Sequence, residues 1–209
     1  ANDAIGLIQT AEGAMTETHS MLQRMKTLTT QAANGTYTKT ARDNIQAEVD
    51  ALNKEITRIA STTKFNGETP LSPAKKGQNL TFFIGATADA TNAMTVGQLT
   101  MTAAALTIAQ IKVDTTTNAF KAMASVDAAI EKVSTYRAAL GAAQNRLEHT
   151  VNNLKVTSEN ITSAESRIRD TDMADEITAY TKNNILLQAA QSMLSQSNAM
   201  PQGVLSMLQ

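Results

Sequence analysis

The side chains that most often carry out catalysis are scarce in this sequence. Of its 209 residues, two are histidines, His19 and His149, and none is a cysteine. Glu148 stands next to His149, but neighbouring residues of a helix point in different directions, so the two do not form an acid–base pair. Neither the zinc-binding HExxH motif nor a glycine-rich phosphate loop occurs. We therefore expect no catalytic residue, no metal site, no cofactor and no enzymatic activity.

Four acidic residues close together are the remaining candidates for a cation site. They are Asp170, Asp172, Asp175 and Glu176. Negative charge is also favoured at the start of a helix, where it interacts with the helix dipole and with unpaired backbone N–H groups. Because this explanation needs no ligand, we interpret the acids as the beginning of a helix near Asp172.

The composition favours long helices and excludes several kinds of partner. Aromatic residues make up 3% of the chain, and the hydrophobic fraction of 42% consists mostly of residues that suit helix–helix contacts. The net charge is −1 and the basic residues are spread along the chain, so the basic surface of a nucleic-acid-binding protein is missing. No apolar run reaches the roughly 18 residues that a membrane span requires. We expect neither nucleic acid nor membrane as a partner.

The spacing of apolar residues predicts two helices in the first third of the chain. The steps alternate between three and four residues, as in a coiled coil. We predict helices at about 2–33 and 39–64, each followed by an Asn-Gly pair suited to a turn. Because the connection is short, the two should lie antiparallel. The apolar positions are Ile8, Ala11, Met15, Thr18, Leu22, Met25, Thr29 and Ala32 in the first helix, and Ile45, Val49, Leu52, Ile56, Ile59 and Thr63 in the second.

A third helix, predicted at about 116–168, has the most regular pattern. Its apolar residues stand seven apart without a break: Val126, Val133, Leu140, Leu147, Leu154, Ile161 and Ile168. At about 1.5 Å per residue this row is roughly 60 Å long, which favours an elongated helical bundle over a compact domain. The companion positions that complete the heptad are Met123, Ile130, Arg137, Gln144, Val151, Ser158 and Glu165. Since several of these are polar, we expect partners that can satisfy polar groups.

The regions between and after these helices differ in pattern. Helical periodicity fails between residues 68 and 118, where the segments 79–84 and 95–101 resemble short strands, and we predict a small β-hairpin in the region 79–101. The last segment, 172–209, is helical in pattern, and Pro201 should kink or restart it. Its apolar positions are Leu186, Ala190, Met193, Ser197, Met200 and Val204.

Several long motifs stand in order along the chain, one group near its beginning and one near its end. The N-terminal motifs are ANDAIGLIQTAEGAM (1–15), LQRMK and TQAANGTYT (within 22–38), IQAEVDALNKEI (45–56) and TKFNG (63–67). The C-terminal motifs are YRAALGAAQNRLEHTVNNL (136–154), AESRIRDTDMADE (164–176), NNILLQAAQSMLSQSN (183–198) and PQGVLSML (201–208). Together these motifs resemble the two conserved halves of bacterial flagellin, most closely flagellins of Bacillus-like Gram-positive bacteria. Flagellins begin with a further helix, so the resemblance implies that this chain lacks its N-terminal segment.

The resemblance implies a structural subunit of the flagellar filament, secreted to the extracellular flagellum and cytoplasmic before export. Residues 1–168 would form the outer core domain, and residues 172–209 the C-terminal half of the inner core domain. Other flagellin subunits and an export chaperone specific to flagellin would bind the C-terminal segment. Without the helix that normally packs there, we expect the chain not to form filaments. The residues implied in polymerisation or chaperone binding are Ile185, Leu186, Ala189, Ala190, Met193, Leu194, Met200, Val204, Leu205 and Leu208.

The resemblance also implies a surface read by the host Toll-like receptor that senses flagellin. The family uses an Arg and a Leu on the first helix and a Glu on the second, which correspond to Arg24, Leu28 and Glu48. Gln23 and Gln31 flank them. The alternative is that Leu28 packs on a neighbouring helix and that the charges are ordinary solvated ones.

Two other classes of protein share parts of this pattern. A hook–filament junction protein has the same paired terminal helices and differs mainly in its middle domain. An intracellular helical signalling module, such as a chemoreceptor cytoplasmic region, also has long heptads, but it lacks the TKFNG and SRIRDTDMA motifs.

Overall fold

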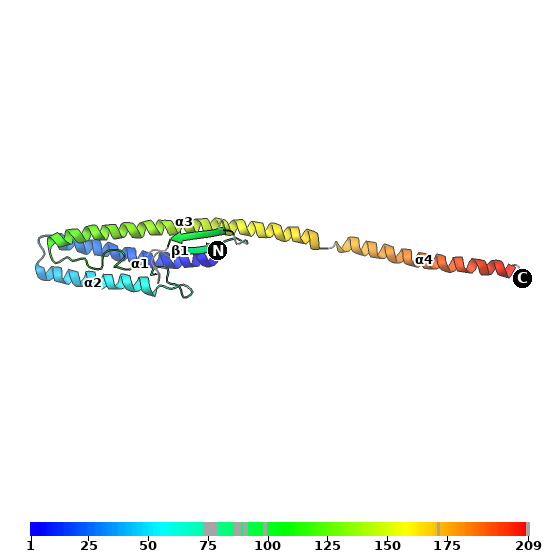
Figure 1. The fold of residues 1–209 in the computed structure, drawn as a ribbon, viewed down its shortest axis with the longest axis horizontal. Helices are drawn as coiled ribbons and strands as arrows, with labels where there is room; N and C mark the ends of the chain where they lie inside the picture. Colours follow the sequence, from blue (N-terminus) through cyan, green and yellow to red (C-terminus); the bar gives the residue numbers. More distant parts are fainter. Residues whose placement is uncertain (73–78, 86–88, 90–91, 98–99, 171, 208–209) are drawn as a thin grey trace. The chain divides into compact units, whose positions relative to one another are not determined.

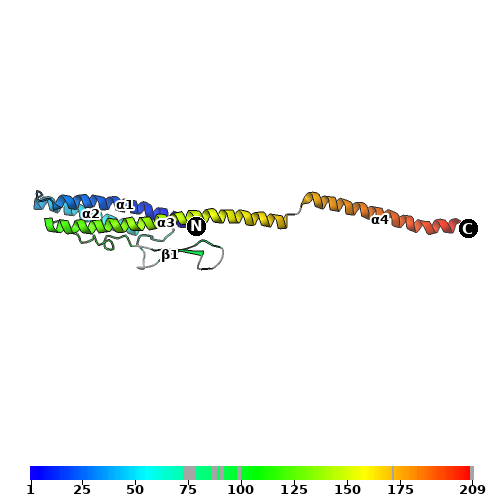
Figure 2. The ribbon, with the colours of Figure 1, turned by 90° about the horizontal axis from the view of Figure 1, so that it is seen from above.

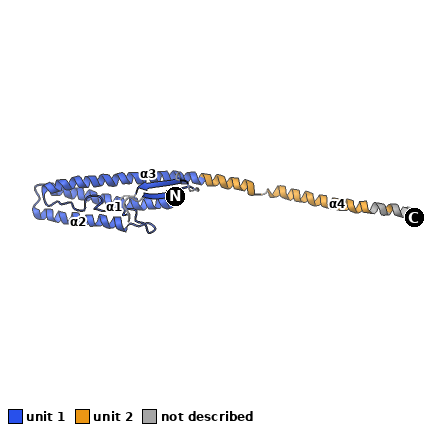
Figure 3. Ribbon diagram, in the orientation of Figure 1, with its two compact units in different colours: residues 1–155 blue, residues 156–209 orange. Residues whose placement is uncertain are grey.

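The computed structural model describes residues 1–72, 79–85, 89, 92–97, 100–170 and 172–207, and it divides into two compact units. Unit 1 is residues 1–155 and unit 2 is residues 156–209 (Figure 3). The elements are α1 (Asn2–Ala33), α2 (Lys39–Thr62), β1 (Asn79–Phe83), β2 (Ala93–Gly97), α3 (Thr116–Arg169) and α4 (Met173–Met207), as Figure 1 shows. The prediction of a mainly helical fold with one β-hairpin is confirmed.

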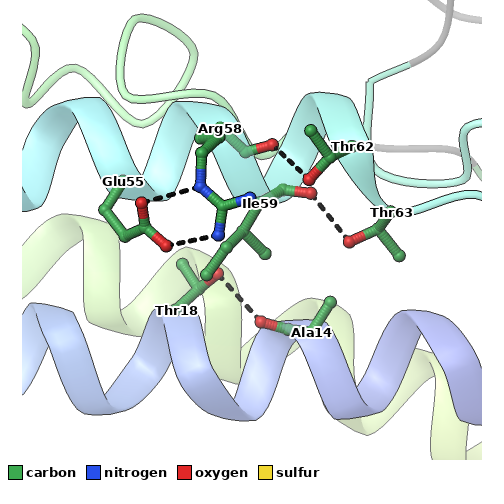
Figure 4. Close-up of polar contacts among 7 residues, drawn as sticks. All are labelled: Ala14, Thr18, Glu55, Arg58, Ile59, Thr62 and Thr63. Carbon is green, nitrogen blue, oxygen red and sulfur yellow. Dashed lines mark hydrogen bonds and ion pairs between the residues drawn. The ribbon is translucent and has the colours of Figure 1, made fainter.

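Helix α1 is the centre of unit 1, because it contacts both other helices. The Lys26–Asp127 ion pair (2.8 Å) and the Glu12–Arg137 ion pair (3.6 Å) link α1 to α3. The lower-numbered residue of α1, Glu12, pairs with the higher-numbered residue of α3, Arg137, so the two helices are antiparallel. All eight predicted seam positions of α1 are buried. The buried hydroxyl of Thr18 donates to the carbonyl of Ala14 at 3.0 Å, so this polar residue is satisfied within its own helix (Figure 4).

The connection between α1 and α2 is held by side chains that cap both helices. The guanidinium group of Arg42 donates to the carbonyls of Ala32 (2.9 Å) and Asn34 (3.1 Å), two acceptors at the end of α1. At the start of α2, the hydroxyl of Thr38 accepts from the backbone N–H of Ala41 at 3.3 Å. The short connection and the two caps keep α2 beside α1.

Helix α2 ends at Thr62, two residues before the predicted end, because a tight turn follows. Phe65 and Glu68 exchange two backbone hydrogen bonds of 2.9 and 3.0 Å. The residues between them, Asn66 and Gly67, have φ values of 50° and 86°, the left-handed pair of a type I′ turn. This turn places the ring of Phe65 on α1, where a Cβ added to Gly6 would lie 3.3 Å from the ring. The TKFNG motif therefore joins the end of α2 to the start of α1.

The core positions of α2 and α3 differ from two predictions. In α2 the last part of the seam moves by one residue, so that Ala60 is buried and Ile59 is only half-buried. In α3 the companion positions are Ala122, Ala129, Tyr136 and Ala143. The predicted polar companions Arg137 and Gln144 lie outside the core of unit 1. Three of these four companion positions are alanines, so the buried seam of α3 is made of apolar side chains.

An irregular segment, residues 101–113, completes the core of unit 1, and we call it the strap. Its buried side chains are Met101, Ala103, Leu106, Ile108, Ile111 and Val113. Three polar side chains of α2 bind its backbone. Gln46 donates to the carbonyl of Ile111 (3.1 Å) and accepts from the N–H of Val113 (2.8 Å), Asn53 donates to the carbonyl of Ile108 (3.0 Å), and Thr57 accepts from the N–H of Ala103 (3.3 Å). The sequence predicts neither a helix nor a strand for residues 102–113.

The β-hairpin lies to one side of the helices of unit 1 (Figure 2). Strands β1 and β2 are antiparallel, with Leu80 opposite Val96 and Phe82 opposite Met94. These two pairs face inward, since Met94 and Val96 are buried while Thr81, Phe83 and Thr95 are exposed. The hairpin is confirmed, although β2 begins two residues before the predicted strand.

Helix α4 begins where the acidic residues predicted a helix start. A carboxylate oxygen of Asp172 accepts from the N–H groups of Ala174 (2.9 Å) and Asp175 (3.4 Å). The helix continues through Pro201 to Met207, so the predicted restart at the proline is wrong. In the part of the chain that the structure describes, no cluster of His, Asp and Glu could hold a metal ion, and no helix is long and apolar enough to cross a membrane.

Candidate assembly and recognition surfaces

The last part of α3 exposes the same heptad that its first part buries. Leu147 is fully buried, whereas Leu154 is 39%, Ile161 62% and Ile168 85% exposed. The register of the two α1–α3 ion pairs brings the start of α1 beside Leu147. Beyond that point, nothing in the described residues covers the apolar row of α3.

Helix α4 exposes every predicted assembly residue whose side chain is described. Ile185, Leu186, Met193 and Leu194 are each more than half exposed, and the alanines at 189 and 190 are exposed as well. The side chains of the other four predicted residues lie outside the described part of the chain. These are Met200, Val204, Leu205 and Leu208.

A second apolar row on α4 was not predicted from the sequence. Its members are Met173, Ile177, Tyr180, Leu187 and Leu194, all of them exposed. The steps of four, three, seven and seven residues were present in the sequence, but the count followed only the row through Leu186 and Met193. Because successive residues of a helix lie about 100° apart, the rows through Leu186 and Leu187 cover adjacent faces. We call both rows, with Ile185, the α4 apolar surface.

Charge is absent from most of the α4 apolar surface. Lys182 is the last charged residue of the chain, and 27 residues follow it. A partner that covers this part of α4 would therefore desolvate no charged side chain. The chemistry of α4 is that of helix–helix association.

The predicted recognition residues of α1 and α2 meet at one place, with one exception. Arg24 and Glu48 form an ion pair, with contacts of 2.8 Å from Nε and 2.7 Å from the terminal nitrogen, and both side chains are about half exposed. Gln23 and Gln31 are exposed on the same helix as Arg24. Leu28 is only 2% exposed, so it packs in the core under this patch and does not present its side chain to solvent.

Neighbouring residues hold this patch in place. The amide of Gln23 lies 2.9 Å from Nε2 of His19, and Lys26 is engaged by Asp127 of α3. On α2, both guanidinium contacts of Arg58 go to Glu55, one turn away (Figure 4). These hydrogen bonds lower the pKa of the Glu55 carboxyl below its usual range. The exposed face of α1 and α2 is therefore a polar, ion-paired surface.

The buried heptads of unit 1 and the uncovered apolar helix of unit 2 define a class of protein, a helical subunit that assembles with other helices. Comparison with known proteins identifies the family. The family description "Bacterial flagellin N-terminal helical region" matches residues 1–76, and "Bacterial flagellin C-terminal helical region" matches residues 123–208.

Individual relatives agree with the family match. Flagellin of Bacillus subtilis (strain 168) is 46% identical over 241 aligned residues, which cover 100% of this chain and 78% of the relative. The flagellar filament 33 kDa core protein of Treponema phagedenis is 43% identical, over 100% of this chain and 77% of the relative. The crystal structure of Bacillus cereus flagellin superposes with a TM-score of 0.63 at 31% identity, over 78% of this chain and 92% of that chain.

The chain belongs to the flagellin family. It is a structural subunit of the bacterial flagellar filament, an extracellular assembly that serves motility, and it assembles with other flagellin subunits. Of the three classes that the sequence left open, the comparisons support flagellin over the junction protein and the signalling module.

Proposed function

We propose that the α4 apolar surface is the part of this subunit that polymerises and that, before export, binds a flagellin-specific chaperone in the cytoplasm. One observation carries the proposal: two rows of exposed large apolar side chains lie on a helix that has no charge after Lys182. Burying one such side chain contributes about 1.5–3 kcal/mol, so covering either row strongly favours association. In this proposal residues 1–168 are the outer core domain, residues 172–209 are half of the inner core domain, and the subunit carries out no catalysis.

The experiment places a charge on the α4 apolar surface in the filament-forming bacterium. Leu186→Glu should abolish filaments on the cell surface and weaken chaperone binding to the purified chain, measured by calorimetry. Gln188→Glu adds the same charge to the same helix outside the two rows and should leave both properties intact. Normal filaments in Leu186→Glu cells would show that α4 does not polymerise through this surface.

The same reasoning applies to the polypeptide of residues 1–209 by itself. Ile161 and Ile168 of α3 and the rows of α4 have no cover in its described part. We propose that this polypeptide alone remains unpolymerised, since the helices that should cover these rows are not supplied within it. Sedimentation of long filaments from the purified polypeptide would contradict the proposal.

We propose in addition that the patch of Gln23, Arg24, Gln31 and Glu48 is read by the host Toll-like receptor that senses flagellin, with Leu28 supporting it from the core. The exposed Arg24–Glu48 pair supports this proposal, because it offers a charged, fixed donor and acceptor on one face. Arg24→Ala should reduce activation of a receptor reporter cell line by about tenfold, the equivalent of one charged hydrogen bond. Lys39→Ala removes an exposed lysine of α2 and serves as the control. Full activation of the reporter by Arg24→Ala would contradict the proposal that the receptor reads this patch.

A further inference from the structure

The sulfur chemistry of this chain depends entirely on methionine. The chain has ten methionines and no cysteine, so thioethers are its only sulfur groups. Four of them are buried in unit 1, namely Met15, Met25, Met94 and Met101. Met173 and Met193 on α4 are open to solvent, at 63% and 72% exposure. Among the methionines whose side chains the structure describes, an oxidant in solution therefore meets these two thioethers first.

Met193 is also at the position where oxidation would matter most for association. It lies on the same row of α4 as Leu186 and Ala190, eleven residues after the last charge of the chain. A partner that covers this row must bury the Met193 side chain. The backbone N–H groups around it are already used within the helix, so a new oxygen at this position would find no backbone donor, and among the row positions only the hydroxyl of Ser197, one turn away, could donate to it.

We propose that Met193, with Met173 as a second site, is a modification site. Its oxidation by peroxide prevents the α4 apolar surface from packing against a partner. In the reaction the sulfur takes one oxygen from hydrogen peroxide. The O–O bond breaks, an S–O bond forms, the sulfur loses two electrons, the peroxide is reduced, and water leaves. The product, methionine sulfoxide, is polar and a strong hydrogen-bond acceptor. The inference rests on the proposed role of the α4 apolar surface in polymerisation.

The direction of the switch follows from burial. Before assembly the thioether of Met193 is exposed and open to attack, and after a partner covers the row the same sulfur is out of reach. Oxidation therefore acts on free subunits and not on packed ones. A buried sulfoxide without a backbone donor should weaken association by about tenfold to a hundredfold.

The first experiment measures where peroxide reacts. Subunits released from purified filaments are exposed to dilute hydrogen peroxide, quenched at intervals and mapped by peptide mass spectrometry. Met193 and Met173 should gain oxygen at least about tenfold faster than Met15 and Met25, which react only after local opening of unit 1. In intact filaments Met193 should be as slow as the buried pair. Equal rates at all four positions in free subunits, or fast oxidation of Met193 in filaments, would overturn the proposal.

The second experiment connects the modification to polymerisation of the subunits released from filaments of the bacterium, not of the polypeptide 1–209 alone, and it follows light scattering after seeding. Peroxide should block wild-type subunits, whereas Met193→Leu subunits, which keep the apolar row but cannot be oxidised there, should retain most of their polymerisation. Met193→Gln subunits should fail without peroxide. If Leu186→Glu blocks polymerisation but Met193→Gln does not, the switch is wrong while the proposed surface stands. If Leu186→Glu polymerises normally, the proposed surface itself is wrong.

Discussion

Between Val126 and Leu147, helix α3 places an apolar residue in the core every seven positions, and from Leu154 to Ile168 it continues the same row into solvent. The first part faces α1, which two ion pairs hold in register. The second part has no cover among the residues that the structure describes. One heptad pattern therefore has two structural outcomes within a single helix.

This difference shows what a heptad specifies. The pattern requires that one face of the helix be covered, because each exposed Leu or Ile forfeits the free energy of burial. It does not specify whether the cover comes from the same chain or from another molecule. In a filament subunit, the uncovered part of such a row is the part that remains for assembly.

The largest expected effect comes from two leucines that stand seven residues apart on α3. Leu147→Ala removes a fully buried side chain and should lower the free energy of unfolding by about 2–5 kcal/mol. Leu154→Ala makes the same chemical change at 39% exposure and should cost less than about 1 kcal/mol. Urea unfolding of both variants measures the difference. Equal losses would mean that the covered part of the row extends past Leu147.

Much of unit 1 could be predicted from the sequence, because local periodicity determines it. Every counted seam position of α1 is buried, and the cap at Asp172 is where the sequence places it. These features depend on residues within one or two turns of each other. Leu28 shows the limit of this approach. It lies off the counted seam, yet it is buried because α1 packs against more than one element and needs a second apolar face.

The strap could not be predicted for a related reason. It has no periodicity, and the hydrogen bonds that hold it come from α2 side chains 46–67 residues away in sequence. The sequence gives no sign that Asn53 differs from other polar residues of a helix. In the structure it is buried and donates to the carbonyl of Ile108. The second row of α4 is a different case. Its apolar spacing is present in the sequence, but only the row through Leu186 and Met193 was counted.

A change at Asn53 tests whether polar contacts hold the core of unit 1 as apolar contacts do. Asn53→Ala removes one of two hydrogen bonds to the carbonyl of Ile108, which keeps the N–H of Ile111 at 3.3 Å, and should lower the free energy of unfolding by about 0.5–1.5 kcal/mol. Asn152→Ala, on the exposed surface of α3, makes the same substitution and should stay within about 0.5 kcal/mol. Chemical unfolding of the two variants gives the comparison. Identical stabilities would mean that the strap does not depend on Asn53.

Substitutions to or from glycine should also affect the stability of the two parts of α3 differently, but by less than the leucine substitutions. A methyl group added at Gly141 meets no atom within 4 Å, so Gly141→Ala should raise the free energy of unfolding by about 0.5–1 kcal/mol. Ser158→Gly, in the exposed part, should leave global unfolding unchanged and speed hydrogen exchange only around residue 158. Amide exchange measured by mass spectrometry resolves both effects. A global loss in Ser158→Gly would show that the exposed part unfolds together with the core.

The smallest expected effect concerns pH at the beginning of the packed part of α3. The amide of Asn118 donates to a carboxylate oxygen of Asp114 at 2.8 Å, and this hydrogen bond, with help from backbone N–H groups and Lys112, lowers the pKa of Asp114. Because the folded pKa lies below the unfolded one, the contact stabilises the helix start above the unfolded pKa and is lost as the pH falls through the folded value. Asn118→Ala should raise the pKa of Asp114 towards its ordinary value, as measured by carboxyl NMR titration.

The buried part of α3 provides the contrast for this titration. Acidification of the wild-type chain should loosen the first turn of α3 before the rows at Leu140 and Leu147 lose protection, because the Asp114 contact lies at the surface while those rows lie in the core. In Asn118→Ala the first turn should already exchange faster at neutral pH, with less further change on acidification. If the pKa of Asp114 is the same in both chains, the Asn118 amide does not stabilise this helix start, and α3 depends on its apolar seam alone for its position in unit 1.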